Sequence, residues 1–359
     1  MAGIEEMVHM MVERGASDLH LVVGTYPQLR IDGQLMSIEE IGKLLPDYCQ
    51  QVVYSVLTDE QKKRFESVGE LDLSFGIKGV GRIRMNVFRQ RGTVGAALRS
   101  IPSDPKSFEE IGLPSIVHKV VALRQGLVLV TGPTGSGKTT TLAAMIDYIN
   151  MHRGEHIITI EDPIEFIHRH KISIVAQREV GSDTMSFGNA LKYILRQDPD
   201  VILVGEMRDL ETIQMAMTAA ETGHLVFATL HTPDAVQSIN RIIDVFPSHQ
   251  QPQARSQLSF VLEAVFCQRL LPRKGGRGRV LVCEIMIATP AVRNLIREEK
   301  SFQIYNVIQG GGAQGMQTMN MSLADLVVKG MIEEKVAMEQ SSDPKDLRAL
   351  LERRLGKIG

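Results

Sequence analysis

The residues with the clearest chemical potential form one glycine-rich segment. They are Gly132, Pro133, Thr134, Gly135, Ser136, Gly137, Lys138, Thr139 and Thr140. Their spacing fits the phosphate-binding pattern G-x-x-x-x-G-K-[ST], in which glycines let backbone N–H groups turn toward phosphate oxygens. Lys138 is then expected to reach the β- and γ-phosphates of ATP and Thr139 to ligand Mg²⁺. A buried strand before this segment and a helix after it support the prediction.

Two acidic residues, Glu161 and Glu206, follow buried strands and are candidates for hydrolysis of that nucleotide. The carboxyl ends of parallel strands meet at one edge of a sheet, where ligands bind. We favour Glu161 as the general base, because many RecA-like ATPases carry their water-activating glutamate on the strand after the P-loop helix. Glu206 is then the metal-shell carboxylate, since Gly205 stands where an aspartate is usual in a Walker B strand. The reverse assignment stays open.

Histidines and arginines add weaker candidates. His224 and His231 flank one apolar strand, and on residue type alone such histidines are more often surface or hydrogen-bonding groups than metal ligands. Arg82 and Arg84 share one face of a strand, with Arg99 on a neighbouring strand. Guanidinium groups aimed together suit phosphate oxygens, and a solvated sheet face is the ordinary alternative.

The elements that must position these residues are predicted from apolar periodicity. Unalternating apolar strands are buried on both faces, which indicates a parallel sheet covered by helices. The strands are expected at 127–130, 157–160, 201–204 and 225–230, and the helices near 138–151, 187–197, 209–221 and 233–243.

The last third, from about residue 248, is expected to be mostly helical. One hairpin is predicted at Arg273–Ile287, and its basic tip is interpreted as solvated, because it lacks the aromatic residues that stack on nucleic-acid bases. A surface helix is predicted at Ala291–Glu298. Its apolar stripe is Val292, Leu295 and Ile296, and its exposed row is Arg293, Asn294 and Arg297.

The first hundred residues alternate as short strands with helices between them, and Asp32-Gly33 is a hairpin signal. We therefore predict an α/β protein with a small α+β domain at 1–101, a proline-containing linker at 102–112 and a P-loop domain at 113–359. Its C-terminal helical extension is expected from about residue 288.

Composition bounds the class of protein. The chain has 359 residues, 43% of them apolar, and a formal net charge of -2. Nothing approaches the ~20 uninterrupted apolar residues of a bilayer span, and the charge balance gives no reason to expect nucleic acid as a partner. Cys49, Cys267 and Cys283 form neither a disulfide framework nor a zinc ribbon, which favours a reducing cytoplasm.

Four segments together resemble the secretion ATPases of type II secretion and type IV pili. They are the Walker A segment 132–141, the Asp box 159–165, the Walker B segment 200–209 and the His box 222–232, in the family order. Within that superfamily the chain closely resembles the type IV pilus retraction ATPases, the PilT family. The opening segment 16–21 and the helix Ala291–Glu298 fit it, with Val292 where isoleucine is common. Extension and secretion relatives usually carry an extra N-terminal domain and a tetracysteine site, and this sequence shows neither.

The resemblance implies a PAS-like N-terminal domain, a RecA-like ATPase domain and a homo-hexameric motor that powers pilus retraction and twitching motility. It implies that His224 and His231 sense the γ-phosphate or the state of the subunit. It also implies that arginines act in trans on the nucleotide of a neighbouring subunit: Arg84 and Arg99 fit the family spacing best, and Arg82 is the third candidate. The implied partners are the pilus machinery and an inner-membrane platform protein, at the cytoplasmic face of the inner membrane without insertion. The alternatives are a pilus-extension or type II secretion ATPase, a DNA-transfer translocase, and a nucleotide-sensing accessory without turnover.

Overall fold

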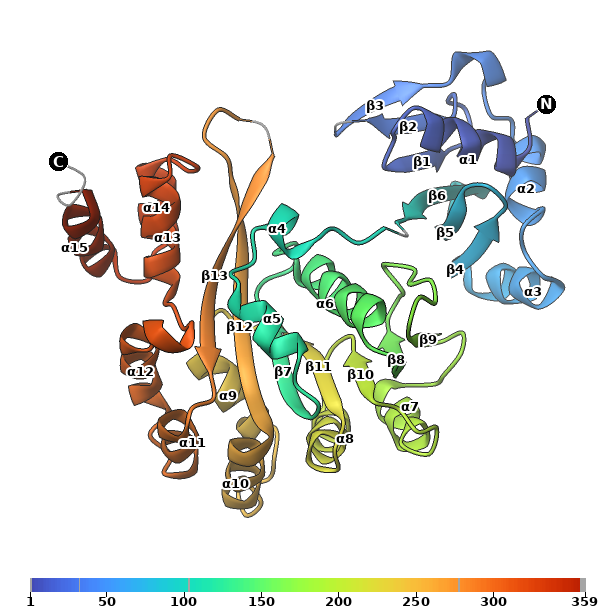
Figure 1. The fold of residues 1–359 in the computed structure, drawn as a ribbon. Helices are drawn as coiled ribbons and strands as arrows, with labels where there is room; N and C mark the ends of the chain where they lie inside the picture. The colour runs from blue at the N-terminus through green and yellow to red at the C-terminus, as the bar shows by residue number, and fades with distance from the viewer. Residues whose placement is uncertain (1, 32, 103, 277, 356–359) are drawn as a thin grey trace. The chain divides into compact units, whose positions relative to one another are not determined.

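The computed structural model describes residues 2–31, 33–102, 104–276 and 278–355 (Figure 1). Its contacts divide the chain into two compact units. The first runs to Asp104 and includes Glu165–Ile167, and the second holds the rest. The two units are described separately below.

The first unit is a six-stranded antiparallel sheet with order β3-β2-β1-β6-β5-β4, accompanied by three α-helices. Buried and partly exposed side chains alternate along its strands, and the buried ones form its core. Along β5 these are Ile83, Met85 and Val87. Its elements are α1 Ile4–Glu13, β1 Asp18–Leu21, β2 Gln28–Ile31, β3 Gln34–Ser37, η1 Glu39–Ile41, α2 Pro46–Tyr54, α3 Asp59–Val68, β4 Glu70–Ile77, β5 Gly81–Gln90 and β6 Thr93–Ile101. Strands β2 and β3 form the predicted hairpin, although Asp32 lies outside the described residues.

The second unit is built on a seven-stranded sheet with order β13-β12-β7-β11-β10-β8-β9. All its neighbouring strands are parallel except β12 and β13. Its first elements are α4 Phe108–Ile111, α5 Ile116–Val121, β7 Gly126–Thr131, α6 Lys138–His152, β8 His156–Glu161, β9 Ile174–Glu179, α7 Phe187–Ile194, β10 Val201–Val204, α8 Leu210–Glu221, β11 Leu225–Leu230, α9 Ala235–Asp244 and α10 Gln251–Val261.

The remaining elements complete the sheet and add helices. They are β12 Leu262–Pro272, β13 Arg279–Ile287, α11 Pro290–Arg297, η2 Ser301–Gln303, α12 Ile304–Gly310, η3 Gly312–Gln314, α13 Met319–Val328, α14 Glu334–Gln340 and α15 Pro344–Leu355. The predicted fold class, an α+β domain followed by an α/β P-loop domain with helices at its C-terminus, is confirmed. Among the described residues no helix has the length and apolarity needed to cross a membrane.

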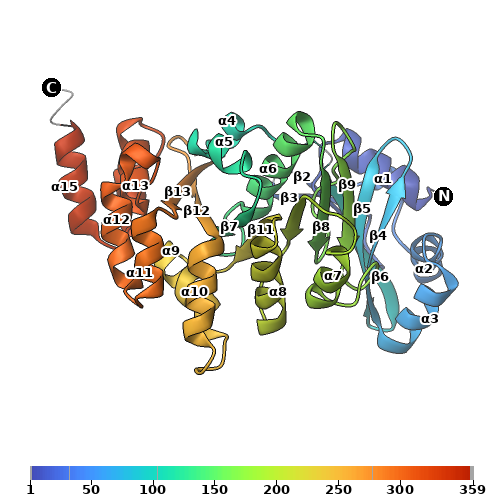
Figure 2. The ribbon, with the colours of Figure 1, turned by 60° about the horizontal axis from the view of Figure 1, so that its bottom comes forward.

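Burial on both faces explains the unalternating strands. Every residue of β7, β10 and β11 is buried. On β7, Val128 and Val130 pack in a cluster with α5 and α6, whereas Leu127 and Leu129 pack in a second cluster with α7 to α10. Figure 2 shows α6 on one side of this sheet and α8 and α10 on the other.

Three sequence predictions are wrong in detail. Residues 108–111, predicted as linker, form α4, because Ser107 and Glu110 make a reciprocal capping box. The predicted hairpin at Arg273–Ile287 has its first strand earlier, as β12. The sequence obscured β12 because it follows α10 directly: Val261 ends the helix, Leu262 begins the strand, and no glycine or proline separates them.

The third correction concerns the helix near residue 291. It forms as α11, with Val292 and Ile296 buried as predicted. Arg293, however, is not part of an exposed row, since only 21% of its side chain is exposed. Its guanidinium donates to the carbonyl oxygens of Ser259 and Phe260 at 2.9 and 2.7 Å and pairs with Glu263 at 2.7 Å. Arg293 therefore joins α11 to the end of α10, where helix carbonyls lack intrahelical partners.

Candidate functional site

The glycine-rich segment joins β7 to α6 at the carboxyl edge of the second unit's sheet. Gly132, Gly135 and Gly137 have φ angles of 137°, 79° and 90°, which favour glycine. A Cβ at Gly132 would lie 2.3 Å from the backbone oxygen of Gln268 on β12. The loop therefore depends on glycine both for its backbone angles and for the close approach of the neighbouring strand.

The polar atoms around this loop suit a phosphate chain. The Lys138 ammonium donates to the backbone oxygens of Gly132 and Pro133 at 2.7 and 3.2 Å, so it lies across the loop. The hydroxyl group of Ser136 is buried without a hydrogen-bond partner among the described residues. Buried polar atoms are normally paired, so this hydroxyl fits a site that binds a polar ligand.

The other residues predicted to bind the nucleotide lie where they are accessible to it. Pro133, Thr134 and Gly135 are exposed at the crest of the loop, and Thr139 and Thr140 are half-buried in the first turn of α6. The N-terminus of a helix attracts anions through its unpaired N–H groups and its dipole. Gly132 and Ser136 are buried, and the other residues of Gly132–Thr140 are exposed or half-buried at the end of β7.

Glu161 ends β8 at the same edge of the sheet, with 7% of its surface exposed. Its Oε1 accepts hydrogen bonds from the Thr159 hydroxyl at 2.7 Å and from the Gln177 amide at 3.1 Å. Gln177 belongs to β9, a strand that the sequence did not predict. These donors fix the direction of the carboxylate, which a group that orients water requires.

Glu206 follows β10 and contacts two basic side chains. Its Oε2 pairs with Arg208 at 2.7 Å, and its Oε1 lies 3.1 Å from Nε2 of His231, which follows β11. Burial raises the pKa of Glu206, but the hydrogen bonds and charges of Arg208 and His231 outweigh it and hold that pKa below its usual value. The carboxylate is therefore kept ionised at neutral pH, as a group near a metal ion needs to be.

Gly205 has a structural reason to replace the usual aspartate. A Cβ there would lie 3.0 Å from the backbone oxygen of Ile160 and 3.2 Å from Cα of Glu161. The end of β10 thus approaches the end of β8 so closely that a side chain at this position would be crowded by the backbone of β8. The first carboxylate after β10 is Glu206.

The structure separates the two histidines. His231 lies at the carboxyl edge beside Glu206, whereas His224 precedes β11 at the opposite edge, where its Nδ1 lies 2.9 Å from the Ala219 carbonyl oxygen. A six-residue strand spans ~20 Å. Within one chain His231, and not His224, lies at the edge that carries the phosphate loop.

The three arginines lie together in the first unit. Arg84 on β5 stands directly opposite Arg99 on β6, and Arg82 is two residues along the same face of β5. Arg82 donates to the Ser74 hydroxyl at 2.6 Å. Arg99 pairs with Asp18 at 2.7 Å, yet 66% of its side chain remains exposed. The predicted face therefore exists, with guanidinium groups available to an anion.

Several residues around the phosphate loop were missed from the sequence. Gln268 donates to the Thr141 hydroxyl at 2.7 Å, and its own Oε1 is buried without a hydrogen-bond partner. Only the pairing of β12 with β7 brings Gln268 to the loop, so no local signal identified it. Arg208 had a signal, because it stands two residues after Glu206 in the Walker B segment.

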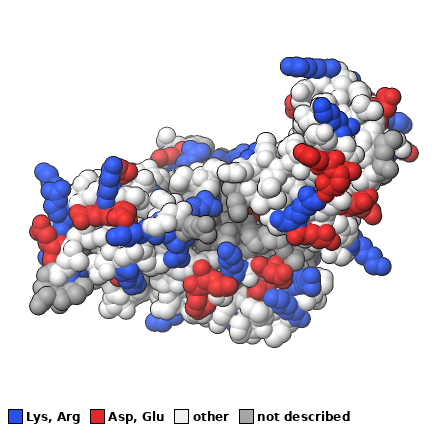
Figure 3. Space-filling model, turned by 90° about the horizontal axis from the view of Figure 1, so that it is seen from above, with Lys and Arg blue, Asp and Glu red and all other residues white. Residues whose placement is uncertain are grey.

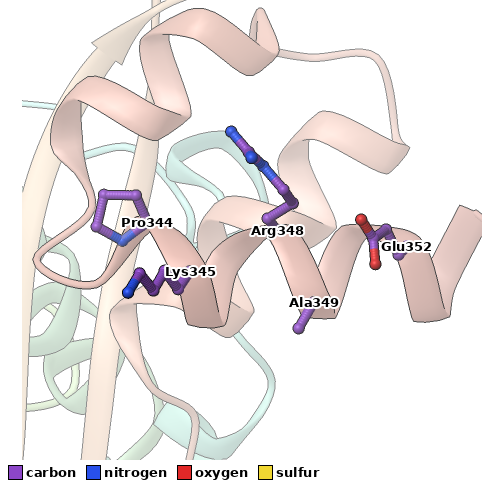
Figure 4. Close-up of a pocket in the computed structure, with 5 residues that line it drawn as sticks. All are labelled: Pro344, Lys345, Arg348, Ala349 and Glu352. Carbon is purple, nitrogen blue, oxygen red and sulfur yellow. The ribbon is translucent and has the colours of Figure 1, made fainter.

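Other surface features do not compete with this site. The hollow shown in Figure 4 lies along α15, and its lining residues, Pro344, Lys345, Arg348, Ala349 and Glu352, all come from that one helix. In the view of Figure 3, basic and acidic side chains are interspersed over the surface. Within the described residues no cluster of three or more His, Cys, Asp or Glu side chains is arranged to hold a metal ion.

Comparison with known proteins agrees with this geometry. The model of the family described as "Type II/IV secretion system protein" matches residues 2–337. The chain belongs to this family. The chain is also 50% identical to the type IV pilus retraction ATPase PilT of Pseudomonas aeruginosa over 343 residues, which are 96% of this chain and 99% of that protein.

Two further relatives support this placement. The type IV pilus ATPase PilU of Pseudomonas aeruginosa is 40% identical, over 97% of this chain and 91% of that protein. Among solved structures, the pilus retraction motor PilT with bound ADP aligns with a TM-score of 0.92 and 52% identity. That alignment covers 97% of this chain and 100% of that one. As a family member, the chain is a close relative of ADP-binding pilus retraction motors.

Proposed function

We propose that this protein is an ATP-hydrolysing motor that powers type IV pilus retraction. The observation that carries the proposal is the meeting of the phosphate loop, Glu161, Glu206 and His231 at one edge of the sheet. The 50% identity to PilT across nearly the whole of both chains supports retraction as the task. The solved relative with bound ADP supports an adenine nucleotide as the ligand.

Mg²⁺ fits this site as an ion held mostly by the nucleotide. Mg²⁺ prefers oxygen ligands and keeps several waters, so it needs few protein ligands. A hydroxyl on Thr139 and an ionised carboxylate on Glu206 match that donor set. When bound, the ion neutralises charge on the phosphates. In this proposal Lys138 and the loop amides hold the phosphates, and Glu161 orients and deprotonates water. Glu206 holds the outer metal shell, and His231 beside it is the proposed sensor of the γ-phosphate.

The proposed motor is a homo-hexamer whose site is completed by arginines of a neighbouring subunit. Arg84 and Arg99 are the proposed fingers, with Arg82 as the third candidate. They lie opposite each other on neighbouring strands, Arg99 is exposed and Arg84 is half-buried, so both can face an anion supplied by another subunit. Hydrolysis would then change the arrangement of the units in the ring. A platform protein of the inner membrane is the proposed recipient of that motion, at the cytoplasmic base of the pilus.

The exposed residues of α11 are proposed to serve the machine rather than the chemistry. Asn294 and Arg297 lie on its outer face, with Arg297 over the ring of the exposed Phe260 at 5.7 Å. No residue of α11 belongs to a segment that forms the phosphate edge. A surface of this kind suits contact with a partner protein.

A deletion strain tests the function. Cells without the gene should be hyperpiliated and unable to twitch, and wild-type protein should restore twitching while Lys138→Ala should not. Bald cells would indicate pilus extension instead. Purified protein should hydrolyse ATP in steady state, and the absence of turnover would indicate a nucleotide-sensing accessory.

A further inference from the structure

Glu284 is a buried carboxylate that the proposed chemistry does not use. It lies on the edge strand β13 with 3% of its surface exposed. Its Oε1 accepts a hydrogen bond from the backbone N–H of Ala235 at 2.9 Å, and the backbone N–H of Met319 donates to the same carboxylate. Ala235 is the first residue of α9 and Met319 the first of α13. One side chain therefore joins the N-termini of two helices.

The first of these helices begins next to the nucleotide edge. Only three residues separate Ala235 from His231, which contacts Glu206. This short loop is braced internally: the hydroxyls of Thr232 and Ser238 are 2.6 Å apart, and Ser238 donates to the backbone oxygen of Asp234 at 2.7 Å. These bonds tie the residue after His231 to the first turn of α9.

The second helix belongs to the C-terminal extension. β13 is also attached to its start through the backbone, since Ile285 and Gln317 exchange N–H···O bonds of 2.8 and 3.1 Å. The Ser322 hydroxyl of α13 accepts a bond of 3.2 Å from the N–H of Cys283. Figure 1 shows α13 beside β13. Of these contacts, the Glu284 carboxylate alone also reaches α9.

The electrostatic surroundings make this link sensitive to pH. Burial raises the pKa of Glu284 to about 7, and the N–H groups of Ala235 and Met319 lower it only in part. The other charged or titratable groups that face Glu284 are Asp234, Arg269, Cys267, Cys283 and Tyr305. An apolar side chain of similar size would avoid the desolvation penalty but would leave both N–H groups unpaired.

We propose that Glu284 is a positioning residue that ties the His231 loop to the C-terminal helices and thereby holds His231 against Glu206. This inference rests on the proposed function and adds to it a route between the nucleotide edge and the extension. Through that route, movement of α13 alters the site, and changes at the site reach α13.

The test compares Glu284→Gln and Glu284→Leu with wild-type protein, using steady-state ATP hydrolysis at several pH values. Ser322→Ala is the matched control, because it loosens the same contact of α13 with β13 without touching α9. We expect Glu284→Leu to lower kcat by about ten- to hundredfold, because misplacing a catalytic contact by ~1 Å has effects of this size. KM for ATP should stay within about twofold, since the phosphate loop is intact.

The pH profile separates positioning from simple structural support. Wild-type kcat should rise between pH 6 and 8 as Glu284 ionises and grips both N–H groups, and Ser322→Ala should keep that profile. Glu284→Gln remains neutral and should lose this part of the rise, whereas rises caused by other groups persist in every variant. If Glu284→Leu fails to fold, as judged by circular dichroism, Glu284→Gln still carries the test.

Two outcomes would overturn the inference: a wild-type pH profile in Glu284→Gln, or a loss of kcat in Ser322→Ala as large as in Glu284→Leu. Wild-type turnover is measured first and keeps the two proposals distinct. If the wild-type protein does not hydrolyse ATP, the proposed function fails. If it does, wild-type kcat and pH profiles in the Glu284 variants reject only the positioning role.

Discussion

The phosphate edge of the second unit and the arginine face of the first unit both carry groups suited to a nucleotide, but they differ in how complete they are. At the phosphate edge, the glycine-rich loop after β7 and the start of α6 lie within one unit. The ends of β8, β10 and β11 lie at the same edge of the sheet. On the arginine face, Arg82 and Arg99 are held by Ser74 and Asp18. That face therefore orients guanidinium groups through side-chain contacts. A phosphate-binding site can be assembled within one unit, whereas an arginine finger needs a nucleotide site that other residues supply.

Among these predictions, replacement of Lys138 at the phosphate edge should have the largest effect on ATP turnover. Lys138→Ala takes away the cation that lies across the loop, so ATP turnover should fall to background. The side chain contacts loop carbonyls rather than a core, so circular dichroism and the melting temperature should be close to wild type. Turnover near the wild-type rate would show that the phosphate edge does not do the chemistry.

The arginine face should show its importance only between subunits. Arg84→Ala should lower turnover by about 10³-fold, the size of effect that trans-acting arginines have in related phosphoryl transfer. Mixing Arg84→Ala chains with Lys138→Ala chains should restore part of the activity, since some interfaces then combine an intact loop with an intact arginine. If subunits are shown to exchange and no activity returns, Arg84 is not a trans finger.

Substitution of the two carboxylates separates hydrolysis from ATP binding at the phosphate edge. Glu161→Gln and Glu206→Gln should each lower kcat by about 10²-fold or more, because they remove groups that act on water or metal charge. Binding of a fluorescent ATP analogue should persist in both. Loss of binding in both variants, with folding intact, would contradict the assigned roles. Ser182→Ala, in a nearby loop, provides a control outside the proposed machinery.

The smallest expected effect concerns the support of Arg99. Burial raises the pKa of Asp18, but the hydrogen bonds and charge of Arg99 and Ser17 hold it below its usual value. This contribution to stability is therefore present above the unfolded-state pKa of ~4 and lost as pH falls through the folded-state value. Asp18→Asn should lower the free energy of unfolding at pH 7 by about 1 kcal/mol or less, since Arg99 is exposed.

Urea denaturation at pH 7 and pH 3 would measure this difference. The destabilisation of Asp18→Asn relative to wild type should shrink at the lower pH, because pH 3 lies below the unfolded-state pKa of ~4 and the unfolded carboxyl is then protonated. An equal difference at both pH values would show that the ion pair contributes nothing. Asp72→Asn, on the exposed end of β4, is a matched control.

The sequence alone determined the phosphate loop, because its glycines, lysine and helix start act over a few neighbouring residues. It also determined the buried strands around it. Burial on both faces leaves an apolar run that is visible without a partner strand, and β10 and β11 occur at the predicted residues. Glu161, Glu206 and His231 follow such strands, so parallel pairing was enough to bring them to one edge.

Only the tertiary structure decided the features that depend on distant pairing. It turned the segment after α10 into β12, and brought Gln268 to the phosphate loop and Gln177 to Glu161. It also turned Arg293 from a surface residue into a link between α10 and α11. These outcomes rest on hydrogen bonds between residues far apart in the chain, and strand order and helix packing set such bonds rather than any local pattern.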